Sequence, residues 1–336
     1  MKFLCLPGGY CNAKALKIQL GPFCDALASN GSASFHFTQG TTEVHVPPQF
    51  AGFFGPPPNY TFMKVDGPLV RRNMGDFPKR DTPEEAMKAA AQAAGNPTFS
   101  SIAQVMDRLV GILDGEADID GVIGFSEGAQ IAASLILEEQ RREREHGRIP
   151  RLKCAIFFSG WPPVHPVTGR LLTADDYNEE PITIPSCHVV GASDPFIDGS
   201  MALYNMCDPD SADLFDHGAG HLIPRNKKVT EEIALVNPAK DAGLEFRFCH
   251  PYALSPSSGC SYSASFRRHL DQRTSHTNPT PTAPNATVAS TAPITDKTVN
   301  VLALHPNGRA LSSHLSLGPR GQIFAEPNGA NIGTHD

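Results

Sequence analysis

The residues best suited to chemistry lie in the segment GVIGFSEGAQ, residues 121–130, where Ser126 sits between two glycines after an apolar run. The pattern G-x-S-x-G between a strand and a helix is typical of a nucleophile elbow, a sharp turn that presents a serine hydroxyl at the edge of a sheet. Gly124 and Gly128 would leave room for the strained backbone of that turn. A serine hydroxyl is a poor nucleophile at neutral pH, so it needs a base and a third group that orients the base.

Candidates for both partners follow Ser126 in the order that nucleophile-elbow enzymes use, with the acid before the histidine. The segment CHVVGASDPFID places Asp194 directly after an apolar run, and Asp198 lies further from the end of that run. The segment SADLFDHGAGHLIP supplies His217 and His221. We predict Asp194 as the acid and His221 as the base, with Asp198 and His217 as the alternatives.

Such a serine also requires an oxyanion hole, formed by backbone N–H groups that point at the developing negative charge. The residue after the nucleophile, Glu127, would supply one N–H group. The glycine-rich segment FLCLPGGY near the start of the chain would supply the other. Gly9 and Tyr10 are the candidates there, since Pro7 has no N–H group.

Cofactor and metal chemistry find little support in the sequence. The FLCLPGGY turn lacks the GK[ST] and G-x-G-x-x-G patterns of nucleotide-binding loops. The two histidines at 217 and 221 have a spacing that on a helix would favour a metal, but Gly218 and Gly220 argue against a helix there. The eight cysteines contain no C-x-x-C pair. We expect no cofactor and no metal.

Composition bounds the class of protein. A net charge of −7 and a pI near 6.0 provide no general attraction to nucleic acid or to anionic membranes. No segment has the roughly 18 uninterrupted apolar residues that a membrane helix needs. The opening MKFLCL has too short an apolar run for a signal peptide, so we interpret it as a first strand. Cysteines within apolar runs indicate reduced thiols, and we expect a cytoplasmic protein.

Up to residue 237, apolar runs of strand length alternate with segments of helical period, which predicts an α/β protein with a mostly parallel central sheet and helices on both faces. Residues 100–115 place their apolar side chains on one helical face, and the helix after Ser126 should be buried in its first half and solvated over Arg141–Glu145. The predicted strands are KFLCL, ASFHFTQ, GVIGF, KCAIFFSG, CHVVGAS and SADLFDHG.

Two regions depart from this alternation. Residues about 51–100 are rich in proline and aromatic side chains, and we interpret them as a lid-like insertion over an apolar pocket, or as a surface loop packed on its own aromatics. Within them Thr82, Pro83 and Glu85 predict the start of a short helix. Residues 238–336 are polar and proline-rich without periodicity, and we expect a disordered tail.

The chain resembles the fungal FSH1-type serine hydrolases, a branch of the α/β-hydrolase fold that includes esterases and thioesterases encoded beside polyketide synthases. The resemblance covers about residues 1–237 and rests on LCLPGG, GFSEGA, HVVGASD and HGAGHLIP, in family order. It implies Ser126 as nucleophile, Asp194 as acid and His221 as base. The family usually has His-Gly where this chain has Pro7-Gly8. Its members end soon after the position of residue 237, which implies that the tail is an addition or a product of gene prediction.

The resemblance implies an acyl ester or thioester as substrate, and a polyketide synthase carrier protein as a partner that could present the acyl chain. Three alternatives stay open. The same triad could transfer the acyl group to an alcohol or amine, or the fold could be a catalytically silent binding protein with a small-ligand pocket. The TNPTPTAP stretch of the tail could instead serve protein interaction and scaffolding.

Overall fold

The computed structural model describes residues 1–29, 33–46, 54–64, 78–94, 99–176 and 181–235, together with the backbone of three further strands between 299 and 325. The chain divides into two units, Met1–Thr277 and Asn278–Asp336. All residues discussed as a candidate site lie in the first unit.

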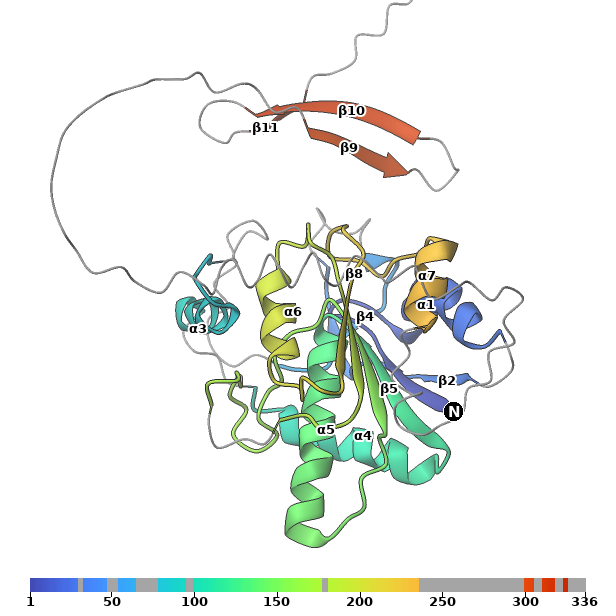
Figure 1. Ribbon diagram of the computed structural model, residues 1–336, viewed down its shortest axis with the longest axis vertical. Helices are drawn as coiled ribbons and strands as arrows, with labels where there is room; N and C mark the ends of the chain where they lie inside the picture. Colours follow the sequence, from blue (N-terminus) through green and yellow to red (C-terminus); the bar gives the residue numbers. More distant parts are fainter. Residues whose placement is uncertain are drawn as a thin grey trace, which may run out of the picture. The chain divides into compact units, whose positions relative to one another are not determined.

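The first unit is built on a six-stranded parallel sheet with the strand order β2-β1-β5-β6-β7-β8 (Figure 1). All six predicted strands are confirmed. Because the chain runs from β1 outward to β2 and then resumes on the other side of β1 with β5, the loops after β1 and β5 meet at the carboxyl edge of the sheet. The strands are β1 (Lys2–Leu6), β2 (Ser34–Phe37), β5 (Ile119–Phe125), β6 (Cys154–Phe158), β7 (Ser186–Val190) and β8 (Ala212–Asp216).

Helices cover both faces of this sheet, as the sequence predicts. Successive strand residues point to opposite faces, so Leu4 and Leu6 enter one buried cluster while Phe3 and Cys5 enter the other. The first cluster packs against α4 (Ile102–Gly115) and α5 (Glu127–His146), and the second against α1 (Ala13–Leu27) and α7 (Lys227–Leu235). The predicted apolar face of α4 is confirmed, since all six of its members are buried: Ile102, Val105, Met106, Leu109, Val110 and Leu113.

The region of the predicted insertion contributes a helix and one strand of a small antiparallel pair. Strands β3 (Thr42–Val44) and β4 (Asn59–Thr61) pair antiparallel, and helix α3 (Pro83–Ala93) packs against α6 (Ile197–Tyr204). The predicted start of α3 is confirmed, because the Thr82 side chain accepts a hydrogen bond from the Glu85 N–H group. Among the side chains of the predicted insertion, Phe62 and Met63 are buried, whereas residues 51–53 and 65–77 lie outside the described residues.

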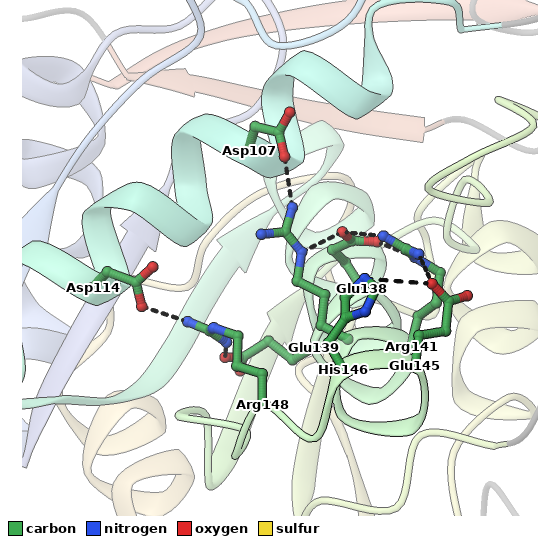
Figure 2. Close-up of polar contacts among 9 residues, drawn as sticks. Asp107, Asp114, Glu138, Glu139, Arg141, Glu145, His146 and Arg148 are labelled. Carbon is green, nitrogen blue, oxygen red and sulfur yellow. Dashed lines mark hydrogen bonds and ion pairs between the residues drawn. The ribbon is translucent and has the colours of Figure 1, made fainter.

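Buried charges extend further along α5 than the sequence indicates. Glu138 and Glu139 are only 3% and 1% exposed. The solvated end expected over Arg141–Glu145 is confirmed for residues 143–145, which are exposed, whereas Arg141 and Arg142 are half-buried and pair with Glu138. Ion pairs compensate for the loss of hydration at the buried carboxylates. Figure 2 shows Glu138 in contact with Arg141, and Arg148 joining Glu139 to Asp114. Arg142 pairs with Glu138 and with Asp107 of α4.

The second unit contains a three-stranded antiparallel sheet in the order β11-β10-β9. Its strands are β9 (Val299–Leu304), β10 (Ala310–Leu317) and β11 (Ile323–Ala325). The structure thus describes strands in part of the tail where the sequence predicts disorder, and the remainder of that prediction falls outside the described residues.

Candidate active site

Ser126 occupies the turn between β5 and α5 with a backbone that L-amino acids rarely adopt, φ 54° and ψ −118°. Two close approaches make this turn possible. A Cβ atom on Gly124 would lie 2.4 Å from the Ala129 Cα atom, and one on Gly128 would lie 2.1 Å from the Leu6 carbonyl oxygen. Glycine at both positions therefore lets β1 and α5 close around the serine, which is the local geometry of a nucleophile elbow.

His221 joins Ser126 to Asp194 through hydrogen bonds on both ring nitrogens. The Nε2 atom lies 2.9 Å from Ser126 Oγ, and the Nδ1 atom lies 2.8 Å from Asp194 Oδ2. Asp194 is only 3% exposed, and its other oxygen accepts a hydrogen bond from the Phe196 N–H group at 2.8 Å. The carboxylate is thus held in one orientation, and it can fix the ring so that Nε2 faces the hydroxyl.

The loops that carry the acid and the histidine are fastened to each other. A Cβ atom on Gly191 would lie 2.0 Å from the Ala219 carbonyl oxygen, so only glycine permits this approach. That same oxygen accepts a hydrogen bond from the Ser193 N–H group at 3.1 Å, and the Ser193 hydroxyl donates to the Gly218 carbonyl at 2.9 Å. These contacts set the spacing of Asp194 and His221.

The structure does not bring the two alternative residues into this arrangement. Asp198 lies in the first turn of α6, beyond the loop that carries Asp194. The Nδ1 atom of His217 accepts a hydrogen bond from Ala219 N–H at 3.3 Å, and its Nε2 atom is buried without a hydrogen-bond partner among the described residues. Burial lowers the pKa of His217, which favours the neutral form of its ring.

Aromatic side chains surround the histidine. Its ring centroid lies 5.3 Å from that of Phe125 and 5.3 Å from that of Phe196, which in turn contacts Trp161 at 5.7 Å. Nearby, Tyr10 packs on Phe54 with centroids 5.2 Å apart. Aromatic side chains in this arrangement suit contact with an apolar group bound beside Ser126.

The three predicted oxyanion residues lie together beside the elbow. Glu127 is the first residue of α5, and the loop after β1 lies beside it. A Cβ atom on Gly8 would lie 3.3 Å from the Ser126 Cβ atom, and one on Gly9 would lie 3.2 Å from Glu127 Oε2. Tyr10 has a positive φ of 59°, so the chain turns sharply there. The role of these N–H groups stays a prediction.

The Glu127 side chain is a feature that the sequence analysis missed. Its Oε1 atom accepts hydrogen bonds from the Thr61 hydroxyl and from the N–H groups of Phe62 and Met63. Burial raises its pKa to about 7, against the opposing effect of these hydrogen bonds. The available signal was a carboxyl group next to the nucleophile, but its partners lie more than sixty positions away and no local pattern identifies them.

Within the described residues, no group of three or more histidine, cysteine, aspartate or glutamate side chains is placed to hold a metal ion. The helices of the same part of the chain include none that is long and apolar enough to cross a membrane.

Comparison with known proteins matches the sequence model of one family, Serine hydrolase (FSH1), to residues 1–233. The chain belongs to this family. It is therefore a serine hydrolase with the α/β-hydrolase fold, and the resemblance inferred from its motifs is confirmed.

Curated relatives of this serine hydrolase carry the names hydrolase and esterase. Hydrolase phiM of Talaromyces stipitatus is 29% identical over 240 residues, covering 69% of this chain and 84% of the relative. Esterase FPY3 of Fusarium mangiferae is 27% identical over 230 residues, covering 67% and 89%. Among solved structures, SOBER1 of Arabidopsis thaliana aligns with a TM-score of 0.43 and 16% identity over 72% of this chain and 98% of that chain.

Proposed function

We propose that the protein hydrolyses an acyl ester or thioester through a triad of Ser126, His221 and Asp194. The observation that carries the proposal is the continuous path of hydrogen bonds from the buried carboxylate through both ring nitrogens to the serine hydroxyl. Membership of a serine hydrolase family supports it.

In the first half of the reaction, His221 Nε2 accepts the proton of Ser126 as Oγ attacks the acyl carbonyl carbon. The carbonyl oxygen becomes an oxyanion, which the N–H groups of Glu127 and of Gly9 or Tyr10 would stabilise. Asp194 stabilises the imidazolium that forms. Collapse of the tetrahedral intermediate breaks the bond to the alcohol or thiol, which leaves with the proton from His221, and the acyl group stays on Ser126.

Water completes the reaction by the same route in reverse. His221 Nε2 removes a proton from water as its oxygen attacks the acyl carbon, and a second oxyanion forms in the same position. When this intermediate collapses, Ser126 recovers the proton from His221 and a carboxylic acid is released.

The acyl group is proposed to be a polyketide chain or a related secondary-metabolite intermediate, delivered by a synthase carrier protein. The resemblance to thioesterases encoded beside polyketide synthases supports this, and the aromatic side chains of Phe125, Trp161 and Phe196 around the triad favour an apolar acyl group. A cytoplasmic location is proposed with it, supported by buried cysteines that carry free thiols.

A matched pair of acyl substrates tests the proposed function. The wild-type protein and Ser126→Ala are assayed with an aliphatic p-nitrophenyl ester and with the corresponding N-acetylcysteamine thioester, and the products are identified with and without an added alcohol or amine. Release of the free acid by the wild type alone supports hydrolysis. An acyl-alcohol or acyl-amide product in its place would point to acyl transfer. Failure of well-folded wild type to consume either compound would favour the silent binding protein.

A further inference from the structure

The carboxyl group of Glu127 makes contacts that the proposed reaction does not use. Its Oε1 atom accepts three hydrogen bonds, from Thr61 Oγ1 at 2.5 Å and from the N–H groups of Phe62 and Met63 at 3.1 Å each. Its Oε2 atom is buried without a hydrogen-bond partner among the described residues. Leaving a carboxyl oxygen buried without a partner costs free energy.

The segment that Glu127 holds is attached to the loop after β1. The buried side chain of Asn59 donates from Nδ2 to the Tyr10 carbonyl at 2.8 Å. The Tyr60 N–H group donates to the Cys11 carbonyl at 3.3 Å. The residues on both sides of Thr61 therefore bind either the elbow or the loop that contains Gly9 and Tyr10.

A second contact joins the same loop to Glu127 directly. Gly9 lies over the carboxyl group so closely that a Cβ atom there would be 3.2 Å from Oε2. The Glu127 carboxyl group thus lies next to the loop after β1 and also accepts hydrogen bonds from residues 61–63, the segment attached to that loop. The backbone N–H group of Glu127 is the predicted oxyanion donor of the elbow. The two halves of the predicted oxyanion hole have one side chain in common.

We propose that Glu127 is a positioning residue whose carboxyl group sets the spacing between the oxyanion donor of the elbow and the donor of the loop after β1. The inference rests on the proposed triad mechanism. Since Oε1 accepts all three hydrogen bonds, a glutamine can reproduce them and an alanine cannot. The role therefore depends on the acceptor oxygen and not on the negative charge.

Variants of Glu127 separate this role from a contribution to folding. Glu127→Ala and Glu127→Gln are compared with Glu143→Ala, which removes an exposed carboxyl from the same helix. Each is assayed for kcat and KM with p-nitrophenyl hexanoate and for inhibition by an aliphatic trifluoromethyl ketone, which forms a tetrahedral adduct resembling the intermediate. Circular dichroism and thermal unfolding establish that each variant is folded.

The expected result is a parallel loss in two quantities. Glu127→Ala should lower kcat by about 10-fold to 100-fold, less than or comparable to the loss of one oxyanion donor. It should weaken inhibition by the ketone by the same factor, with KM little changed. Glu127→Gln should recover most of the lost activity, and Glu143→Ala should match the wild type. Unchanged kcat in folded Glu127→Ala, or a lower kcat with unchanged ketone inhibition, would overturn the proposal.

If Glu127→Ala does not fold, Thr61→Val takes its place. This variant removes the shortest hydrogen bond to Oε1 without substituting a residue of the elbow itself. It should lower kcat and ketone affinity together, by a smaller factor, and no change in either would overturn the inference. Failure of the proposed function is distinguishable, because the wild type itself would then neither hydrolyse the ester nor form a serine adduct with a fluorophosphonate.

Discussion

The Nε2 atom of His221 lies 2.9 Å from the Oγ atom of Ser126, although the two residues are 95 positions apart in the chain. Two different parts of the fold make this contact. The strained turn after β5 presents the hydroxyl, and the loop after β8 brings the ring to it while the loop after β7 holds Asp194 behind it. The parallel sheet places all three loops at its carboxyl edge.

Exchange of Asp194 for asparagine should separate the chosen acid from its alternative. Asparagine can still bind the ring but neither stabilises the imidazolium nor holds the correct tautomer, so Asp194→Asn should lower kcat by about 10³-fold to 10⁴-fold. Asp198→Asn should retain most of the activity. Steady-state kinetics on an aliphatic p-nitrophenyl ester measure both, and equal losses in the two variants would contradict the assignment.

Ser126 and Asp194 could be proposed as candidates because each follows an apolar run of strand length, whereas His221 lies beyond the end of β8, which the alternative His217 adjoins. Such runs carry a strong local signal, which is why the six strands of the sheet and the buried face of α4 could also be predicted. Because the strands run parallel, their carboxyl ends lie at one edge of the sheet. The hydrogen bonds themselves depend on tertiary contacts, and these are visible only in the structure.

Glu127 and Glu138 illustrate what could not be predicted. Both are charged residues at positions where the local pattern indicates solvent or a helix start, and both have buried carboxyl groups. Their partners are Thr61 and the following N–H groups in one case, and arginines of the same helix in the other. Burial was decided by residues that pack over these carboxylates and not by the periodicity of α5.

Two glycine-to-alanine variants should change stability in opposite directions. In Gly128→Ala the new Cβ atom would meet the Leu6 carbonyl oxygen, so the elbow must shift and unfolding should become easier by about 1–3 kcal/mol. Gly111 lies on an exposed part of α4 with open space around it, and Gly111→Ala should raise stability by roughly 0.5–1 kcal/mol. Urea unfolding measures both, and a shift of the same sign in the two variants would contradict the geometry.

The stability of the protein should carry a pH dependence from Glu127. Since burial raises its pKa from 4.5 to about 7, the folded state holds a proton that the unfolded chain releases, and the charged form is penalised. Stability from this group is intact below pH 4.5 and is lost as the pH rises through 7. Between pH 5 and pH 8 the free energy of unfolding of the wild type should fall by roughly 2–3 kcal/mol relative to that of Glu127→Gln. Chemical denaturation at several pH values checks this, and a constant difference would refute it.

Arg148 should contribute to the stability of the fold and not to catalysis. It pairs at 2.8 Å with Glu139, whose side chain is 2% exposed, so Arg148→Ala leaves a buried carboxylate without its cation and should cost about 3 kcal/mol. Lys227→Ala removes an exposed pair with a 3.9 Å separation and should cost less than about 0.5 kcal/mol. Urea unfolding measures both costs, and kcat of folded Arg148→Ala should equal that of the wild type. Equal stability losses in the two variants would contradict the burial of Glu139.

The most direct test of Ser126 as an activated nucleophile is intact-mass detection of fluorophosphonate labelling on the wild type and on Ser126→Ala. The reagent phosphonylates a serine that a base has activated, and it requires no knowledge of the natural substrate. We expect a single adduct on the wild type and none on Ser126→Ala. A folded wild-type protein without an adduct, or an adduct that persists in Ser126→Ala, would contradict the claim that His221 and Asp194 activate this serine.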